Sequence, residues 1–318
     1  MAHIGKDIEK AIRLLNDGEV IGIPTETVYG LAGNALNNDT VARIFEVKNR
    51  PSFDPLIIHT NSIKRFQNYI SEIDERVYTL AEKFMPGPLT LLLPRKDIIP
   101  DLVTSGLENV AIRIPNHPLT LELLSQLEFP LAAPSANPFG YISPTNAIHV
   151  NNQLGDKIKY ILDGGDCQVG IESTIVGFVD NEAIIYRKGG LSIEAIETIV
   201  GKVNVIEHSS SNPLAPGMLK SHYAPKKPLI LLNKNQVIEP EKKKIAYLGF
   251  KQYNPFIPVE NQLLLSPNGD FREAARHLFA YMRYLDAMDV DIIYTELLPE
   301  KELGRAINDR IRRATVKE

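Results

Sequence analysis

The chain of 318 residues has a single cysteine, Cys167, and no tryptophan. One cysteine cannot form an internal disulfide, and this usage is typical of a reducing cytosol, so we expect a cytoplasmic protein. No apolar run approaches the ~20 residues that cross a bilayer, and the first residues lack a signal-peptide pattern, so we expect no membrane association.

An excess of charge of one sign is also lacking, because the net charge is only −4. This balance argues against a protein that coats nucleic acid or anionic membrane broadly. The hydrophobic fraction of 44% predicts a folded protein rather than a disordered one. The length is sufficient for two domains of ordinary size.

Several familiar catalytic motifs are missing from the sequence. It has no G-x-x-x-x-G-K-[ST], which excludes a P-loop, and no G-x-G-x-x-G dinucleotide fingerprint. It also lacks H-E-x-x-H, a cysteine cluster and the G-x-S-x-G nucleophile elbow. These absences disfavour a zinc enzyme and a serine hydrolase, and they leave the metal ligands unknown, with Asp163 in the turn D-G-G as a weak candidate.

The hydrophobic pattern divides the chain into three parts. Residues 1–206 mix strands and helices, and residues 207–227 are rich in Ser, Pro and Gly, which predicts a linker. In residues 228–318 strands alternate with helical patterns, notably over residues 270–288 and 304–314. This alternation predicts a small α/β domain with a parallel sheet.

One stretch near the start, V-I-G-I-P-T-E-T-V-Y-G, organises the first part. Its apolar half predicts a buried strand, which Pro24 ends. The strand then passes into Thr25, Glu26 and Thr27, an arrangement that presents polar side chains to a ligand from a rigid base. An ordinary Ser/Thr turn explains the same residues equally well.

Cationic side chains recur at the ends of predicted elements. Lys48 and Arg50 lie at the end of a helix predicted over residues 39–48, and Arg187 follows a strand. Such residues often only complement a helix dipole or face solvent. Arg113 lies within the apolar strand A-I-R-I-P, so it either faces solvent or is buried beside an anion. Together with nearby hydroxyls, these cations suit a small polyanionic ligand bound without a P-loop.

Other polar residues flank apolar strands, and each has an ordinary structural explanation. His59 ends a predicted strand, where a capped or core histidine is more common than a ligand. Ser135 and Ser173 lie in segments that turn chemistry would also explain.

A series of motifs resembles the YrdC-like family. These motifs follow one another in the family's order and cover most of residues 10–200. They are P-T-E-T-V-Y-G-L, K-N-R-P, P-L-I-I-H, P-G-P-L-T-L, V-A-I-R-I-P, A-A-P-S-A-N, S-P-T, D-G-G and E-S-T-I-V. A-P-G-M-L-K-S-H-Y-A-P and G-R-A-I-N-D-R-I-R-R-A resemble its longer form. The resemblance implies a YrdC-like domain with a twisted mixed sheet around a concave cavity, plus a small Rossmann-like C-terminal α/β domain.

The resemblance also implies a nucleotidyltransferase. Such an enzyme condenses L-threonine, bicarbonate or CO2, and ATP into threonylcarbamoyl-AMP and pyrophosphate, and we expect Mg²⁺ to accompany the ATP. The product would feed threonylcarbamoyladenosine modification of tRNAs that read ANN codons. The tRNA threonylcarbamoyl-transfer machinery is therefore an expected partner.

By resemblance, specific residues acquire expected roles. The catalytic residues would be Lys48 and Arg50. The threonine contacts would be Thr27, His59, Arg113, Ala133 and Ser173. The ATP contacts would be Lys48, Arg50, Asp54, Asn109, Ser135, Ser143, Arg187 and Lys220. The family often has Asn at the position of Asp54, whose carboxylate would repel phosphates unless a cation intervenes. The linker, with His222 and Tyr223, is a candidate lid.

An alternative from another class is a non-enzymatic protein that binds double-stranded RNA or ribosomes. It would use a basic patch on the last helix, formed by Arg305, Arg310, Arg312 and Arg313. The same residues could equally form a solvated face with nearby acidic residues.

Overall fold

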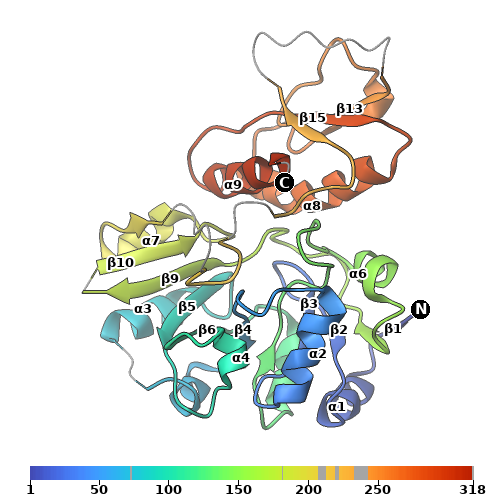
Figure 1. Ribbon diagram of the computed structural model, residues 1–318. Helices are drawn as coiled ribbons and strands as arrows, with labels where there is room; N and C mark the ends of the chain where they lie inside the picture. Colours follow the sequence, from blue (N-terminus) through green and yellow to red (C-terminus); the bar gives the residue numbers. More distant parts are fainter. Residues whose placement is uncertain (72–73, 181, 207–212, 219–221, 233–242, 317–318) are drawn as a thin grey trace.

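The computed structural model describes residues 1–71, 74–180, 182–206, 213–218, 222–232 and 243–316. Two sheets organise it, a mixed sheet of eleven strands and a parallel sheet of four. In Figure 1 the small sheet lies at the top, and the two helices below it face the larger unit. The predicted mixed α/β architecture with a second parallel sheet is confirmed.

The large sheet has the strand order β1-β8-β2-β3-β7-β4-β6-β5-β9-β10-β11. Its strands are β1 His3–Gly5, β2 Ile21–Ile23, β3 Gly30–Asn34, β4 Ile57–His59, β5 Leu89–Pro94, β6 Asn109–Arg113, β7 Leu131–Ala132, β8 Tyr160–Leu162, β9 Thr174–Val179, β10 Glu182–Arg187 and β11 Asn204–Val205. The central pair β4 and β6 is parallel, whereas β7 and β5 flank that pair in antiparallel orientation.

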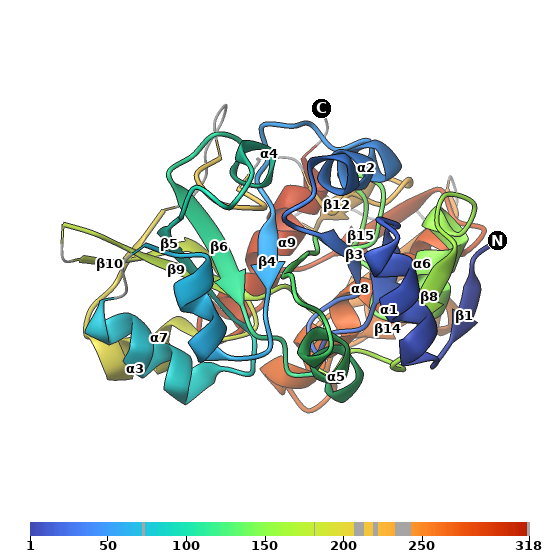
Figure 2. The same ribbon diagram turned by 90° about the horizontal axis from the view of Figure 1, so that it is seen from below.

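Helices cover this sheet and connect its strands. They are α1 Ile8–Asn16, α2 Asn38–Lys48, the 3-10 helix η1 Ile63–Asn68, α3 Glu75–Phe84, α4 Asp101–Thr104, α5 Pro118–Ser125, α6 Ala147–Leu154 and α7 Ile193–Val200. Seen from below, β4 and β6 lie at the centre, with α2 and α4 toward one edge and α3 and α5 toward the opposite one (Figure 2).

Helix α2 fixes the direction in which the first cations leave the sheet. The Asn37 side chain caps its start by accepting a hydrogen bond from the Thr40 amide. Its end is at Asn49, whose left-handed conformation (φ 52°) turns the chain directly after Lys48. The helix predicted over residues 39–48 is confirmed, and the turn aims Arg50 back toward the sheet.

The small sheet is built as predicted for residues 228–318. Its strands β12 Leu229–Leu231, β13 Ile245–Gly249, β14 Gln262–Leu264 and β15 Ile292–Thr295 are all parallel, in the order β12-β15-β13-β14. The helices of this unit are the short η2 Val259–Asn261, then α8 Phe271–Ala287 and α9 Gly304–Thr315. The domain boundaries at residues 206 and 228 stay predictions.

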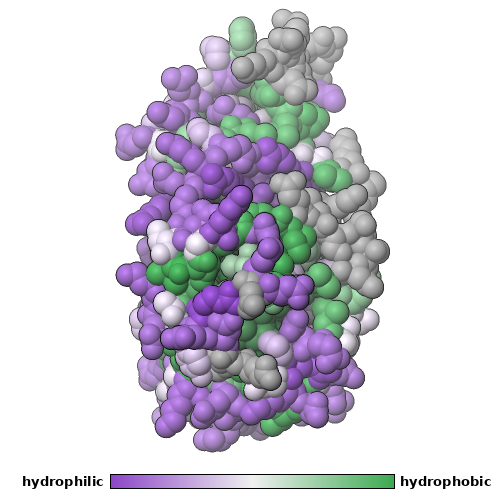
Figure 3. All heavy atoms as spheres, turned by 90° about the vertical axis from the view of Figure 1, so that its left-hand side faces the viewer, coloured by the Kyte–Doolittle hydropathy of each residue, from purple (hydrophilic) through white to green (hydrophobic). Residues whose placement is uncertain are grey.

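The two units share one hydrophobic cluster. Val28 and Ile142 of the larger unit pack with Tyr223 of the linker and with Leu278 and Phe279 of α8. On the face turned left in Figure 1, hydrophilic residues dominate, and hydrophobic ones appear at mid-height near the junction of the units (Figure 3). Because of this shared cluster, the junction between the two units is packed rather than open.

Among the described residues, no helix is long and apolar enough to span a bilayer.

Candidate active site

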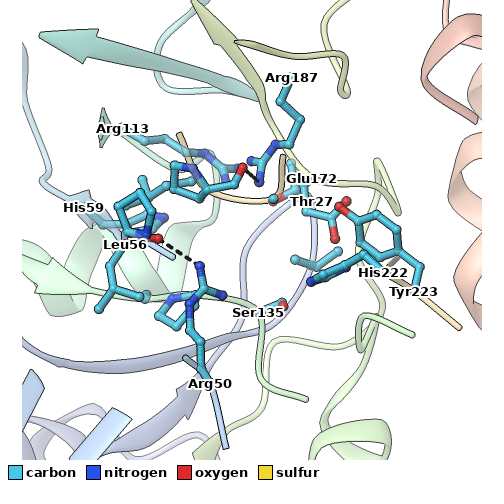
Figure 4. A pocket seen from close by; sticks show the side chains of 17 residues that line it. Thr27, Arg50, Leu56, His59, Arg113, Ser135, Glu172, Arg187, His222 and Tyr223 are labelled. Carbon is cyan, nitrogen blue, oxygen red and sulfur yellow. Dashed lines mark hydrogen bonds between the residues drawn. The ribbon is translucent and has the colours of Figure 1, made fainter. Parts of the chain in front are cut away.

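A cavity of about 520 Å³, its open mouth included, lies over the ends of the central strands. It is lined by Thr27, Val28, Arg50, Pro55, Leu56, Ile57, His59, Arg113, Ala133, Pro134, Ser135, Glu172, Arg187, Pro216, Gly217, His222 and Tyr223. Arg50, Arg113 and Arg187 reach it from three sides, and His222 and Tyr223 close a fourth (Figure 4). The structure thus brings together seven residues predicted from the sequence: Thr27, Arg50, His59, Arg113, Ala133, Ser135 and Arg187.

The sheet register places two of these residues side by side. In the parallel pair β4 and β6, His59 lies opposite Arg113 at the carboxyl ends of both strands. His59 is buried, and burial together with the Arg113 charge lowers its pKa to about 3. The imidazole is therefore neutral at physiological pH, and it meets the cavity as a hydrogen-bonding group.

The structure decides whether Arg113 faces solvent or is buried beside an anion, which the apolar strand pattern left open. Its side chain is 5% exposed and forms an ion pair with Glu26, with Nη2 lying 2.7 Å from Oε1. Its Nε donates to the Gly87 carbonyl at 3.2 Å, and Glu26 Oε2 accepts the Asn116 amide. The solvent-facing alternative is wrong. Among the described residues Nη1 has no hydrogen-bond partner, which leaves it available to a ligand.

Lys48 acts on the cavity through the chain around it. It is buried, and its Nζ donates to the carbonyls of Ser135 and Asn137 at 2.5 and 2.6 Å. Burial, with the nearby Arg50 charge, holds its pKa well below the ordinary value. Lys48 does not line the cavity, and its hydrogen bonds instead fix the segment that carries Ser135.

Arg50 is held by the turn that follows it. Its Nε donates to the Asp54 carbonyl at 3.1 Å, and its Nη2 donates to the Pro55 carbonyl at 2.8 Å (Figure 4). The same Nη2 lies 2.9 Å from Oδ2 of Asp54, a carboxylate that is fully buried. Asp54 thus has the neighbouring cation that its carboxylate required, and it holds Arg50 rather than facing the cavity.

A connected set of side chains forms the opposite wall. Arg187 donates from Nε and Nη2 to the carbonyl and hydroxyl of Ser173, each at 3.0 Å. The Ser143 hydroxyl donates to Glu172 Oε1 at 2.5 Å. Burial would raise the pKa of Glu172, but the charges of Arg310 and Arg187 outweigh it and lower that pKa. Ser143 and Ser173 are buried behind the wall, so they orient the residues that line it.

One predicted ATP contact, Asn109, lies away from the cavity. Asn109 is exposed at the first residue of β6, whereas Arg113 stands at the last, so Asn109 does not line the cavity. Lys220 lies outside the described residues.

Sequence reasoning assigned no site role to Glu172 and no ion pair to Glu26, although it placed Glu26 among the polar side chains that could face a ligand. Each is buried and paired with an arginine from a distant segment. Both belong to short hydroxyl-rich motifs, P-T-E-T and E-S-T, beside apolar strands. A carboxylate beside a buried strand needs a buried cation, so the acidic residue in each motif could have indicated an ion pair.

The second domain reaches the wall of the cavity through arginines of α8 and α9. Arg310 of α9 is fully buried and donates from Nε and Nη2 to Glu172 Oε2 at 3.2 and 3.1 Å. Arg283 of α8 donates from Nε to the Ser143 carbonyl at 3.1 Å. Arg313 is also buried. The basic RNA-binding patch predicted on the last helix is therefore wrong, because two of its four arginines face inward.

The remaining wall comes from residues of the predicted linker, whose role as a lid stays a prediction. His222 and Tyr223 are buried and line the cavity. Burial and the nearby charges of Arg313 and Arg50 lower the pKa of His222, so its ring is neutral at physiological pH. Gly217 adopts a positive φ of 76°, and a Cβ built on it would lie 3.2 Å from Arg187 Nη1. The linker backbone therefore presses closely on Arg187.

Comparison with known proteins gives consistent matches along the chain. A family model described as telomere recombination matches residues 13–189, and one described as the C-terminal domain of threonylcarbamoyl-AMP synthase matches residues 191–316. The threonylcarbamoyl-AMP synthase of Pyrococcus abyssi is 38% identical, over 97% of this chain and 94% of its own. That of Bacillus subtilis is 37% identical, over 96% and 92%.

A solved structure gives the same picture in three dimensions. The crystal structure of P. abyssi Sua5 complexed with L-threonine matches with a TM-score of 0.91 at 36% identity. The match covers 99% of this chain and 97% of that one. The similarity therefore extends through both domains.

Proposed function

The chain belongs to the threonylcarbamoyl-AMP synthase family, and from this membership we propose that it condenses ATP, L-threonine and bicarbonate-derived CO2. The products would be threonylcarbamoyl-AMP and pyrophosphate. One observation carries the proposal: Arg50, Arg113 and Arg187 converge on a single cavity. Such a cavity suits a triphosphate and an amino-acid carboxylate held side by side.

The threonine side of the cavity would be formed by Thr27, His59, Arg113 and Ala133. Arg113 would bind the threonine carboxylate through Nη1, because Glu26 and Gly87 occupy its other nitrogens. Neutral His59 would add a hydrogen bond without adding charge. Ser173 would act indirectly, by orienting Arg187.

The nucleotide side would be formed by Arg50, Ser135 and Arg187. Lys48, Asp54 and Ser143 would position these groups, since each is hydrogen-bonded or ion-paired behind the wall. Lys220 remains a prediction, and we assign no contact to Asn109 because of its place at the far end of β6.

The chemistry would need no covalent enzyme intermediate. The threonine amine nitrogen bonds to the carbon of CO2 and loses a proton, which gives N-carboxythreonine. An oxygen of its new carboxylate attacks the α-phosphorus of ATP, and the bond to the bridging oxygen breaks as pyrophosphate leaves. Arg50 and Arg187 would neutralise the charge that develops on the phosphates, so catalysis is mainly positioning and electrostatic stabilisation.

Mg²⁺ would enter with ATP as part of the substrate. Among the described residues, no group of three or more His, Cys, Asp or Glu could hold a metal ion. Among the lining residues that the structure describes, Glu172 is the one carboxylate, and Ser143 and Arg310 occupy its oxygens. Because Mg²⁺ is often held largely by substrate phosphates and water, this arrangement is compatible with its delivery by ATP.

A closed cavity would also protect the labile carbamate from water. The product would then pass to the tRNA threonylcarbamoyl-transfer machinery in the cytoplasm, for threonylcarbamoyladenosine formation in tRNAs that read ANN codons. The RNA-binding alternative has lost its exposed patch and gains no support from the related proteins.

The test is an omission experiment on the full chain. The protein is incubated with MgATP, L-threonine and bicarbonate, and each is left out in turn while pyrophosphate is measured. We expect pyrophosphate only when all three are present. Release without threonine, or no release in the complete mixture, would contradict the proposal.

A further inference from the structure

The turn that follows β2 contains two threonine hydroxyls that bond to each other. The Oγ1 atoms of Thr25 and Thr27 lie 2.8 Å apart, and both side chains are buried. Thr27 lines the cavity, whereas Thr25 does not (Figure 4). Thr25 Oγ1 also accepts the amides of Thr27 and Val28 at 3.1 and 3.2 Å. A hydroxyl that bonds the amides ahead of it in this way fixes a turn.

The hydrogen bonds of Thr25 decide where the proton of Thr27 points. A hydroxyl has one proton to donate, and a carbonyl oxygen can only accept. Thr25 Oγ1 lies 2.7 Å from the Val28 carbonyl, so it donates its proton there. The proton between the two hydroxyls therefore comes from Thr27. This leaves Thr27 Oγ1 with a lone pair, and no proton, for a ligand in the cavity.

A group that only accepts hydrogen bonds selects among the atoms of a ligand. Carboxylate and phosphate oxygens are acceptors themselves, so Thr27 held in this way does not bond to them. The amine of an α-amino acid offers N–H donors, and it lies one carbon away from the carboxylate. Arg113 lines the same cavity as Thr27 and is suited to that carboxylate. The two residues therefore match the two ends of one amino acid.

We propose that Thr25 is a positioning residue, which orients the Thr27 hydroxyl so that it accepts a hydrogen bond from the amine of the bound threonine. This inference rests on the proposed function for the identity of the substrate, and it adds a residue that does not touch that substrate. The nitrogen keeps a donor throughout the reaction. It binds as an ammonium, becomes an amine by losing a proton, and retains one N–H after it bonds to CO2 and loses a second proton. An acceptor serves each of these states, and no proton passes to Thr27.

One turn would then support both contacts to the amino acid. Glu26 lies between the two threonines and pairs with Arg113, with Oε1 lying 2.7 Å from Nη2. This pair leaves Nη1 of Arg113 for the carboxylate. Thr25 fixes the hydroxyl of Thr27 for the amine. The spacing of the two contacts is therefore set by four consecutive residues.

Calorimetric titration of the full chain with L-threonine tests the role of Thr25. Thr25→Val removes the hydroxyl at similar volume, Thr25→Ser keeps it, and Thr40→Val is the matched control. Thr40 is 2% exposed and donates to the Gly18 carbonyl at 3.2 Å, yet it does not line the cavity. We expect Thr25→Val to weaken L-threonine binding about ten-fold, which corresponds to ~1.4 kcal/mol, because the Thr27 hydroxyl is no longer held as an acceptor. Thr25→Ser and Thr40→Val should stay within about two-fold of the wild type.

A double-mutant cycle separates the orientation of Thr27 from a general disturbance of the turn. Thr27→Val removes the acceptor itself and should weaken L-threonine binding at least as much as Thr25→Val. If Thr25 acts through Thr27, the double variant should bind L-threonine no more weakly than Thr27→Val alone. Additive losses, or unchanged L-threonine affinity in Thr25→Val, would overturn the proposal. An equal loss of MgATP affinity in Thr25→Val would also overturn it, since that pattern indicates a general disturbance.

L-2-Aminobutyrate identifies the group of the substrate that Thr27 contacts. This analogue keeps the amine and the carboxylate of threonine and lacks the β-hydroxyl. We expect Thr25→Val to weaken its binding by the same factor as that of L-threonine. If Thr25→Val bound the analogue as tightly as the wild type does, the contact would be to the β-hydroxyl, and the assignment to the amine would be overturned.

A crystal of the wild-type chain with L-threonine answers the question even if the variants do not fold. An amine nitrogen within hydrogen-bond distance of Thr27 Oγ1 supports the inference, whereas an amine that points elsewhere overturns it. The binding measurements do not depend on turnover. Thr25-dependent L-threonine binding by a chain that makes no product would reject the proposed function alone. Normal product formation with Thr25-independent binding would reject this inference alone.

Discussion

The substitution Arg113→Met tests the threonine side of the cavity. Arg113 offers Nη1 to a ligand, while its other nitrogens are bound by Glu26 and Gly87. Methionine keeps most of the aliphatic volume and removes the charge. We expect L-threonine to bind much more weakly and ATP to bind almost as before, because Arg50 and Arg187 remain.

The magnitude follows from the contacts that are lost. A hydrogen bond to a charged group is worth about 1.5–3 kcal/mol, which corresponds to an affinity loss of about 10–150-fold. The same change leaves Glu26, 7% exposed, without its cation. Breaking a buried pair in this way costs about 3–5 kcal/mol of stability. Binding and stability therefore need separate measurements.

Calorimetric titration gives both affinities, and urea unfolding gives the stability. The double variant Arg113→Met/Glu26→Gln removes the unpaired charge, so it should recover part of the stability while threonine binding stays weak. Arg43→Met, an exposed residue paired with Glu46 on α2, is the control and should change neither quantity. Equal losses of ATP and threonine affinity, or threonine binding restored in the double variant, would refute the carboxylate-binding role.

Three further predictions concern the second domain, the buried histidines and the linker. Arg310→Met should lower the free energy of unfolding by about 3–5 kcal/mol, because it leaves the buried carboxylate of Glu172 without its cation. Arg305→Met, which breaks a partly exposed pair with Glu194, should cost no more than ~1 kcal/mol in the same urea unfolding assay. Similar losses in the two variants would contradict the structural role of Arg310. His59 has a pKa lowered to about 3 from the ordinary 6.5, so between those pH values the unfolded chain binds a proton that the folded chain does not, and stability falls as pH drops. His59→Asn should remove up to ~1.4 kcal/mol per pH unit from that slope, and an unchanged slope would argue against a neutral buried imidazole. Gly217→Ala and Gly106→Ala should both strain the backbone at a positive φ, of 76° and 79°, but only the Cβ added at residue 217 would contact Arg187. Only Gly217→Ala should therefore raise the KM for ATP. Equal ATP kinetics in the two variants would contradict the contact.

The sequence was informative where local pattern decides the structure. The helices predicted over residues 39–48 and 304–314 are α2 and α9, because each has a clear apolar period. The strand β3 was not predicted, since its G-L-A-G-N sequence has little strand propensity and Gly30 was expected to close a turn. Its pairing with β2 and with β7, nearly a hundred residues later, defines it. Such long-range pairing leaves no local trace.

The site shows the same division. The motifs identified seven residues that line the cavity, Arg113 among them, but the strand pattern alone did not show that Arg113 is buried beside Glu26. On α9, charged residues at nearly every turn read as a solvated face. The structure shows instead that Arg310 and Arg313 are buried against the first domain. Helical periodicity groups residues into faces, but it does not say which face another domain covers.

The most direct test is a crystal structure of the full chain with L-threonine and a non-hydrolysable ATP analogue. Our account predicts the threonine carboxylate within hydrogen-bond distance of Arg113 and the phosphates between Arg50 and Arg187, in one continuous cavity. The account would be contradicted by either ligand bound outside that cavity. It would also be contradicted if Arg113 did not contact the threonine or Arg50 did not contact the nucleotide.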